Sequence, residues 1–97
     1  MTGTTLATNG LDPRRKRLLY RAWHRGTREM DLIVGRFADA HLTTLAETEL
    51  DEFEHLIEVP DPDLYAALTG ARALPEVEAG ALFRRMKEFH QSGCALP

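Results

Sequence analysis

Apolar residues recur along the chain at intervals of three and four positions, which is the period of one face of an α-helix. No segment alternates apolar and polar residues over more than a few positions, so no strand is predicted. The sequence therefore predicts an all-α fold, a small five-helix bundle with short connections. The five apolar stripes are Leu18, Leu19, Ala22 and Trp23; Met30, Ile33, Val34, Phe37 and His41; Ala46, Leu50, Phe53, Leu56 and Ile57; Leu64, Tyr65 and Leu68; and Ala79, Leu82, Met86 and Phe89.

Capping residues and prolines predict where these helices begin and end. The pairs Asp12-Pro13 and Asp61-Pro62 each place an acidic cap before a proline, which fits the first helical position. Thr44 and Glu47 have the spacing of a capping box, which predicts the start of the third helix. Gly70 offers the left-handed backbone that commonly ends a helix. These signals leave only short connections between the helices.

The length and composition fit one domain. The chain has 97 residues, of which 43% are hydrophobic and 28% are charged, and these values are ordinary for a globular protein. We expect a disordered N-terminal tail at 1–11, a single helical domain at 12–92 and a C-terminal tail at 93–97. No apolar run approaches the roughly 20 residues of a membrane span, and the start of the chain does not have the pattern of a secretory signal. With a single cysteine, Cys94, no internal disulfide is expected, and these features together favour a cytoplasmic protein.

Charge is unevenly distributed, although the net charge is only −3. Residues 14–28 include seven basic residues and no acid, whereas residues 47–63 include eight acids and no Lys or Arg. Two solvated helix faces would account for this pattern, and so would a surface that orients a charged partner. Both interpretations stay open at the level of the sequence.

No familiar catalytic or metal-binding pattern is present. The chain has no phosphate-binding loop, no dinucleotide-binding glycine motif and no nucleophile elbow. Its histidines lack the i, i+3 or i+4 spacing of a helical metal site. We therefore predict neither a catalytic residue nor a metal site. The histidines are His24, His41, His55 and His90.

One feature is compatible with nucleic-acid binding: RRKR at 14–17 begins a basic helix. A helix–turn–helix could be built across Gly26, but the second helix carries Glu29, Asp31 and Asp39, which we expect to face outward and repel phosphate. We expect no nucleic-acid partner. A small DNA-binding regulator and a generic helical protein-binding adaptor remain the alternatives.

The stretch RGTREMD at 25–31 can be explained by local helix physics. Arg25 is a cation at a helix C-terminus, and Gly26 can end that helix in a left-handed conformation. Thr27 can cap the next helix, and Glu29 is an acid in its first turn, where the helix dipole favours negative charge. Spacing alone thus gives these residues a structural role.

The same stretch resembles the RGxxE motif of the FAD assembly factors of succinate dehydrogenase, the SdhE-type flavinators. The matching residues are Arg25, Gly26 and Glu29, with Asp31 shortly after. The resemblance extends over RRKRLLYRAWHRGTREMDLIVGRFADAHL and LAETELDEFEHLIEVPDPDLYAAL, roughly residues 14–68. It implies a five-helix bundle that is not itself an enzyme. It also implies binding to the succinate dehydrogenase flavoprotein subunit, in some bacteria that of fumarate reductase, and covalent attachment of FAD to a histidine of that subunit.

This resemblance implies a partner-binding site at the corner. Gly26 would permit close backbone approach, and Arg25 would offer planar donors to a carboxylate or to carbonyls of the partner. Glu29 would orient Arg25 or accept a hydrogen bond from the partner, with Arg28 and Asp31 at the rim. No tightly bound cofactor is expected, because FAD belongs to the partner.

One departure from the family pattern concerns the fourth helix. Family members often carry Trp near the position of Ala67, where this chain has Ala66-Ala67. The departure puts the surface of this helix in doubt as a binding element, with Tyr65 as the candidate replacement.

Overall fold

The computed structural model describes residues 10–92, and every regular element in this range is helical. The all-α prediction is therefore confirmed for the described part of the chain. The elements are α1 (Pro13–Trp23), α2 (Arg28–His41), the 3-10 turn η1 (Leu42–Thr44), α3 (Glu47–Glu58), α4 (Asp61–Thr69), α5 (Pro75–Glu78) and α6 (Ala81–Gln91). The predicted C-terminal tail and Cys94 lie outside the described residues, as does the predicted N-terminal tail except for its last two positions, where Leu11 packs against the core.

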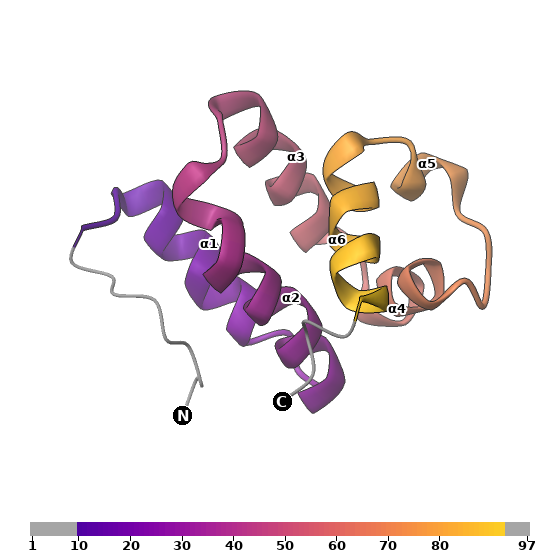
Figure 1. Ribbon diagram of the computed structural model, residues 1–97. Helices are drawn as coiled ribbons and strands as arrows, with labels where there is room; N and C mark the ends of the chain where they lie inside the picture. Colours follow the sequence, from indigo (N-terminus) through magenta and orange to yellow (C-terminus); the bar gives the residue numbers. More distant parts are fainter. Residues whose placement is uncertain (1–9, 93–97) are drawn as a thin grey trace.

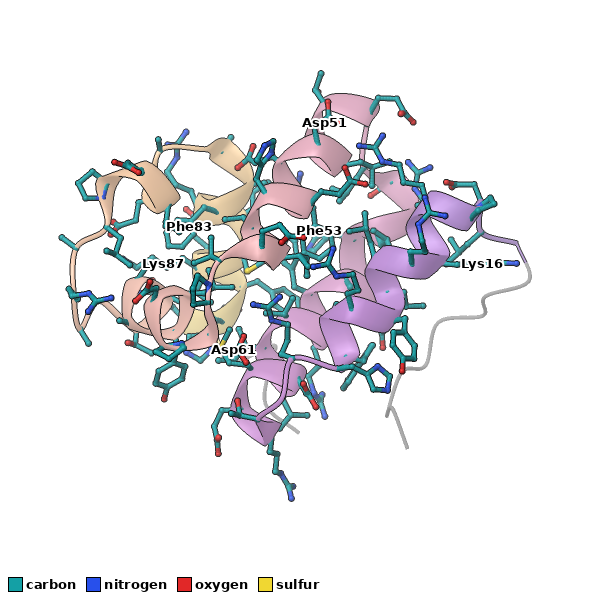
Figure 2. The ribbon with its side chains drawn as sticks, turned by 180° about the vertical axis from the view of Figure 1, so that it is seen from behind. Lys16, Asp51, Phe53, Asp61, Phe83 and Lys87 are labelled. Carbon is teal, nitrogen blue, oxygen red and sulfur yellow. The ribbon has the colours of Figure 1, made fainter. Side chains whose placement is uncertain are left out.

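Helices α1 and α2 form a hairpin around which the other helices assemble. Figure 1 shows them side by side, with α3 beside the hairpin and α6 between the hairpin and α4. Helix α6 contacts α2, α3 and α4, so the end of the chain closes the core. Figure 2 shows Phe53 and Phe83 in this interior, whereas Lys16 and Asp51 point outward.

The predicted apolar stripes form most of the core, but three of their residues are exposed. Ala46 and Ala79 are exposed because each lies at a helix boundary rather than within a helix. Tyr65 faces outward, because α4 buries Leu64, Ala67 and Leu68 at i, i+3 and i+4. Ala67, near which the family resemblance implies a Trp, is fully buried.

The start of α3 lies two residues later than the capping-box prediction. The N-cap is Ala46, and Glu49 Oε1 accepts a hydrogen bond from its backbone N–H at 2.8 Å. Thr44 instead ends the 3-10 turn and donates to the carbonyl of His41 at 2.9 Å. Only the glutamate half of a capping box is thus present, because alanine has no side-chain acceptor. In contrast, the cap at Asp12 is confirmed, since its carboxylate accepts from the Arg15 N–H.

The fifth predicted helix is two helices, α5 and α6, separated at Gly80. Glu52 of α3 reaches the start of α6, where its Oε2 accepts from the N–H groups of Leu82 at 2.7 Å and Phe83 at 3.1 Å. A Cβ at position 80 would lie 2.0 Å from the same oxygen. The break thus depends on a residue from another helix, which local sequence cannot reveal.

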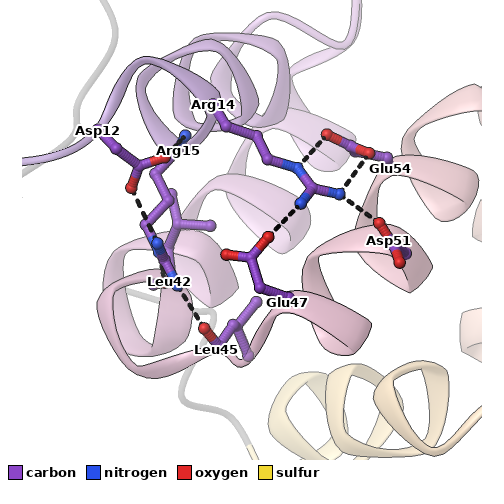
Figure 3. A network of polar contacts seen from close by, with 8 residues as sticks. All are labelled: Asp12, Arg14, Arg15, Leu42, Leu45, Glu47, Asp51 and Glu54. Carbon is purple, nitrogen blue, oxygen red and sulfur yellow. Dashed lines mark hydrogen bonds and ion pairs between the residues drawn. The ribbon is translucent and has the colours of Figure 1, made fainter.

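Residues of the basic and acidic segments form ion pairs with one another. Figure 3 shows Arg14 of α1 bonded to Glu47, Asp51 and Glu54 of α3. The hydrogen bonds from Arg14 hold the pKa of the Glu54 carboxyl below its usual value. Four of the seven basic residues at 14–28, namely Arg14, Arg15, Arg21 and Arg25, form ion pairs. Arg14 and Arg21 pair with α3, so part of the uneven charge of the sequence is an α1–α3 contact and not two freely solvated faces.

Close packing of Trp23 against Gly35 fixes the α1–α2 hairpin. A Cβ at position 35 would lie 2.4 Å from the Trp23 ring, so only glycine fits there. The indole N–H donates to Asp39 Oδ1 at 3.1 Å, which orients the ring. Asp39 was expected to face outward, but it serves this internal contact. The position of the following turn depends on this packing, because Trp23 is the last residue of α1.

Gly35→Ala is expected to destabilise the protein by about 1–3 kcal/mol, because the added methyl group must displace the buried indole. At an ordinary position inside a helix, the same change is expected to stabilise by about 0.5–1 kcal/mol. Urea unfolding would measure the difference. Gly10→Ala is the control, since an added Cβ there meets nothing within 4 Å. A gain in stability for Gly35→Ala would contradict the packing described here.

Candidate functional site

The turn between α1 and α2 carries the residues that the sequence singled out. Gly26 has a φ of +116°, which side chains of L-residues rarely adopt, and it is exposed. Thr27 is the N-cap of α2, as predicted, and its Oγ1 accepts from the Met30 N–H at 3.2 Å. The turn is therefore a defined backbone shape that requires glycine at position 26.

Arg25 points into the molecule, which differs from the expectation that it faces a partner. Its side chain is 7% exposed. Nε donates to Asp61 Oδ1 at 2.9 Å, and the two terminal nitrogens donate to the carbonyls of Ile57 and, at 2.8 Å, Val59. We call this set, with the Asp61 ion pair at 2.7 Å, the Arg25 cluster. It satisfies carbonyl groups around the end of α3 and fastens them to the start of α4.

Asp61 and Asp31 also have roles other than those predicted. Asp61 was expected to cap α4, but the helix begins at this residue and its carboxylate pairs with Arg25. Asp31 was expected at the rim, but it is half-buried and its Oδ1 accepts from the Arg25 N–H at 2.6 Å. Both acids thus hold Arg25 in place, one through its side chain and one through its backbone.

Glu29 and Arg28 are the exposed charges of the corner. Within residues 10–92, neither side chain forms a hydrogen bond or an ion pair, so Glu29 does not orient Arg25. The structure therefore separates the motif into an internal residue, Arg25, and two surface residues, Gly26 and Glu29.

A shallow groove of about 320 Å³ adjoins the corner between the starts of α2 and α4. Tyr65 is 42% exposed on its α4 side. Figure 2 shows Asp61 where α4 meets the corner. The sequence predicted Tyr65 as part of an apolar stripe and as a replacement for Trp, and it did not connect Met30 or Pro62 with the site. The available signal was PDPDLY, which resembles the family at the entry to α4. The groove is lined by Thr27, Glu29, Met30, Asp61, Pro62 and Tyr65.

The described residues contain neither a metal-binding cluster nor a membrane-spanning helix. No group of three or more His, Cys, Asp or Glu side chains within 10–92 is arranged to hold a metal ion. Over the same range, no helix combines the length and the apolar character needed to cross a membrane.

Arg25→Ala is expected to destabilise the fold by about 3–5 kcal/mol, because it leaves a half-buried carboxylate and two carbonyls without their donor. Arg25→Lys should also be destabilised, although less, since an ammonium group cannot reproduce the planar set of donors. Thermal and urea unfolding would measure both. Arg28→Ala is the control for a neighbouring exposed arginine and should stay within about 0.5 kcal/mol of wild type. Wild-type stability of Arg25→Ala would show that the Arg25 cluster contributes nothing.

Comparison with known proteins gives a consistent result. A family model described as flavinator of succinate dehydrogenase matches residues 16–90. The FAD assembly factor SdhE of Acetobacter pasteurianus is 43% identical over 83 residues, which cover 86% of this chain and 76% of the relative. The mitochondrial succinate dehydrogenase assembly factor 2 of Danio rerio is 38% identical over 85 residues, covering 86% of this chain and 54% of the relative. Its counterpart in Caenorhabditis elegans is 35% identical over 82 residues, covering 81% and 69%.

The family match includes both the corner and the groove, since it begins within α1 and ends within α6. It also covers more than half of the chain, as does the match to each of these relatives. The chain belongs to the flavinator family of succinate dehydrogenase assembly factors.

Proposed function

We propose that this protein binds the flavoprotein subunit of succinate dehydrogenase and promotes covalent attachment of FAD to a histidine of that subunit. The observation that carries the proposal is the family match over residues 16–90, together with relatives named as FAD and succinate dehydrogenase assembly factors. The flavoprotein of fumarate reductase is a second partner that the same resemblance implies. The FAD belongs to the partner, and this chain holds no cofactor tightly.

The corner at residues 25–29 is the proposed contact surface. Gly26 is exposed and has no side chain, so a partner backbone can approach the turn closely. Glu29 is exposed and without a contact in the described range, so its carboxylate is available to accept a hydrogen bond. Arg28 lies at the rim, whereas Arg25 and Asp31 act from inside by holding the turn in shape.

The proposed action is positioning. The flavin and the partner's histidine supply the reacting atoms, and attachment requires that they stay within bonding reach. A rigid helper that holds the subunit in this geometry can lower the activation free energy of attachment by roughly several kcal/mol. The Arg25 cluster provides the necessary rigidity, because it fixes the turn to two other helices. No residue of this chain needs to donate or accept a proton in such a role.

Glu29→Ala is expected to lower covalent flavin on the succinate dehydrogenase flavoprotein by about tenfold, a loss of about 1.4 kcal/mol in productive binding. In-gel flavin fluorescence after denaturation would measure it, in cells that lack the gene and carry each variant. Glu76→Ala is the matched control. Glu76 is also an exposed acid in the first turn of a helix without a side-chain contact in the described range, but it lies on α5. Circular dichroism should show both variants folded.

Gly26→Arg is a poorer test, because the φ of +116° makes any side chain strained as well as bulky. Flavin fluorescence that is equal with and without the gene would refute the proposed function. Fluorescence that depends on the gene but not on Glu29 would support the proposed function. It would show that Glu29 is not part of the contact surface.

A further inference from the structure

We infer that the groove between the starts of α2 and α4 receives a segment of the flavoprotein subunit that carries an apolar or aromatic side chain close to an Arg or Lys. The inference rests on the proposed function and extends it, because it names a second contact beside the corner and the chemistry of its occupant. The observations are an apolar floor, an exposed aromatic ring and one carboxylate that nothing in the described range neutralises.

The apolar part of the groove is built from Met30, Pro62 and Tyr65. Tyr65 and Tyr20 are the two large hydrophobic residues that are exposed among residues 10–92. Tyr20 stacks on His24, with ring centroids 3.9 Å apart and an angle of 17° between the rings. Tyr65 has no ring partner in that range. An exposed tyrosine beside an apolar hollow is typical of protein interfaces, because it buries a large area at a low cost in conformational entropy.

The charge of the groove selects a cationic occupant. Glu29 and Asp61 both line it, but Asp61 is neutralised by its ion pair with Arg25, which does not line the groove. Glu29 therefore leaves one uncompensated negative charge. Almost every other acid in the described range is bonded, and the exceptions are Glu76 and Glu88, which lie outside the groove. Arg28 does not line the groove, since successive residues of a helix point in different directions.

The same charge argues against two other occupants. The starts of α2 and α4 would attract an anion through their dipoles, but Glu29 and Asp61 already stand there and would repel it. A second copy of this chain, seated symmetrically, would bring Glu29 against the same patch and oppose like charges. A partner segment with a cation next to an apolar side chain could pair with Glu29 and pack against the apolar lining at the same time.

The groove is also preorganised. The Arg25 cluster ties the start of α4 to the end of α3 and to the corner, so the helix starts that carry Tyr65 and Glu29 are held in place before any partner arrives. Binding then loses little conformational entropy on this side of the interface.

Binding of the purified apo-flavoprotein subunit to the full chain tests the inference. Tyr65→Ala should raise the Kd by about tenfold or more, as expected for a central aromatic contact. Glu29→Gln, which keeps the shape but removes the charge, should raise it by about three- to tenfold and reduce its dependence on ionic strength. Tyr20→Ala and Glu76→Gln are the matched controls and should change the Kd less than about twofold. Melting curves of all four variants exclude unfolding as the cause.

A photoreactive phenylalanine analogue at position 65 identifies the occupant. Crosslinking to the flavoprotein subunit, followed by peptide mapping, should capture a segment with an apolar side chain and an Arg or Lys within a few residues. Capture of an acidic segment, or of a second copy of this chain, would overturn the inference.

The outcomes separate this inference from the proposed function. A wild-type protein that promotes flavin attachment, with folded Tyr65→Ala and Glu29→Gln variants that bind as tightly as wild type, would refute the groove and leave the function intact. A wild-type protein that neither binds the flavoprotein nor changes its covalent flavin would refute the function, and the inference with it.

Discussion

The buried guanidinium of Arg25 is the interaction on which the rest of the site depends. Carbonyl groups around the end of α3 would otherwise lie here without donors, because a helix leaves its terminal carbonyls without partners inside the helix. Arg25 donates to carbonyls around the end of α3 and to the first residue of α4, and its own N–H is held by Asp31 of α2. A buried cation is stable only when it is paired and fully hydrogen-bonded, so the surrounding backbone has little freedom to change.

This arrangement changes how a contiguous motif is understood. Arg25, Gly26 and Glu29 lie within five positions, yet one is 7% exposed and the other two are open to solvent. Loss of activity on substituting Arg25 and on substituting Glu29 would therefore have different physical causes. The first would act through the shape of the turn, and the second through the proposed contact with the partner.

The sequence predicted the helical class, the family and most of the core, because these depend on periodic patterns and short motifs. Trp23, Phe37 and Leu50, for example, are buried as their spacing indicated. The errors at Gly80 and Asp61 come from contacts between residues far apart in the chain, whereas the error at the start of α3 is local, since Ala46 and not Thr44 is the N-cap. Glu52 of α3 binds the start of α6 just after the break at Gly80, and Asp61 pairs with Arg25 instead of capping α4. The groove could not be predicted either, since its lining combines residues from two helices more than thirty positions apart.

The separate placements of Asp61 and Glu29 have an evolutionary consequence. Asp61 contacts Arg25 of the same chain, so a change at either position is expected to be compensated within one gene. Glu29 forms no hydrogen bond or ion pair in the described part of its own chain, so if the proposed contact with the flavoprotein exists, its compensating changes are expected in the flavoprotein gene. The two acids of one groove are thus expected to covary with different residues. Asp61 would covary with Arg25 of the same chain, and Glu29 with residues of the partner.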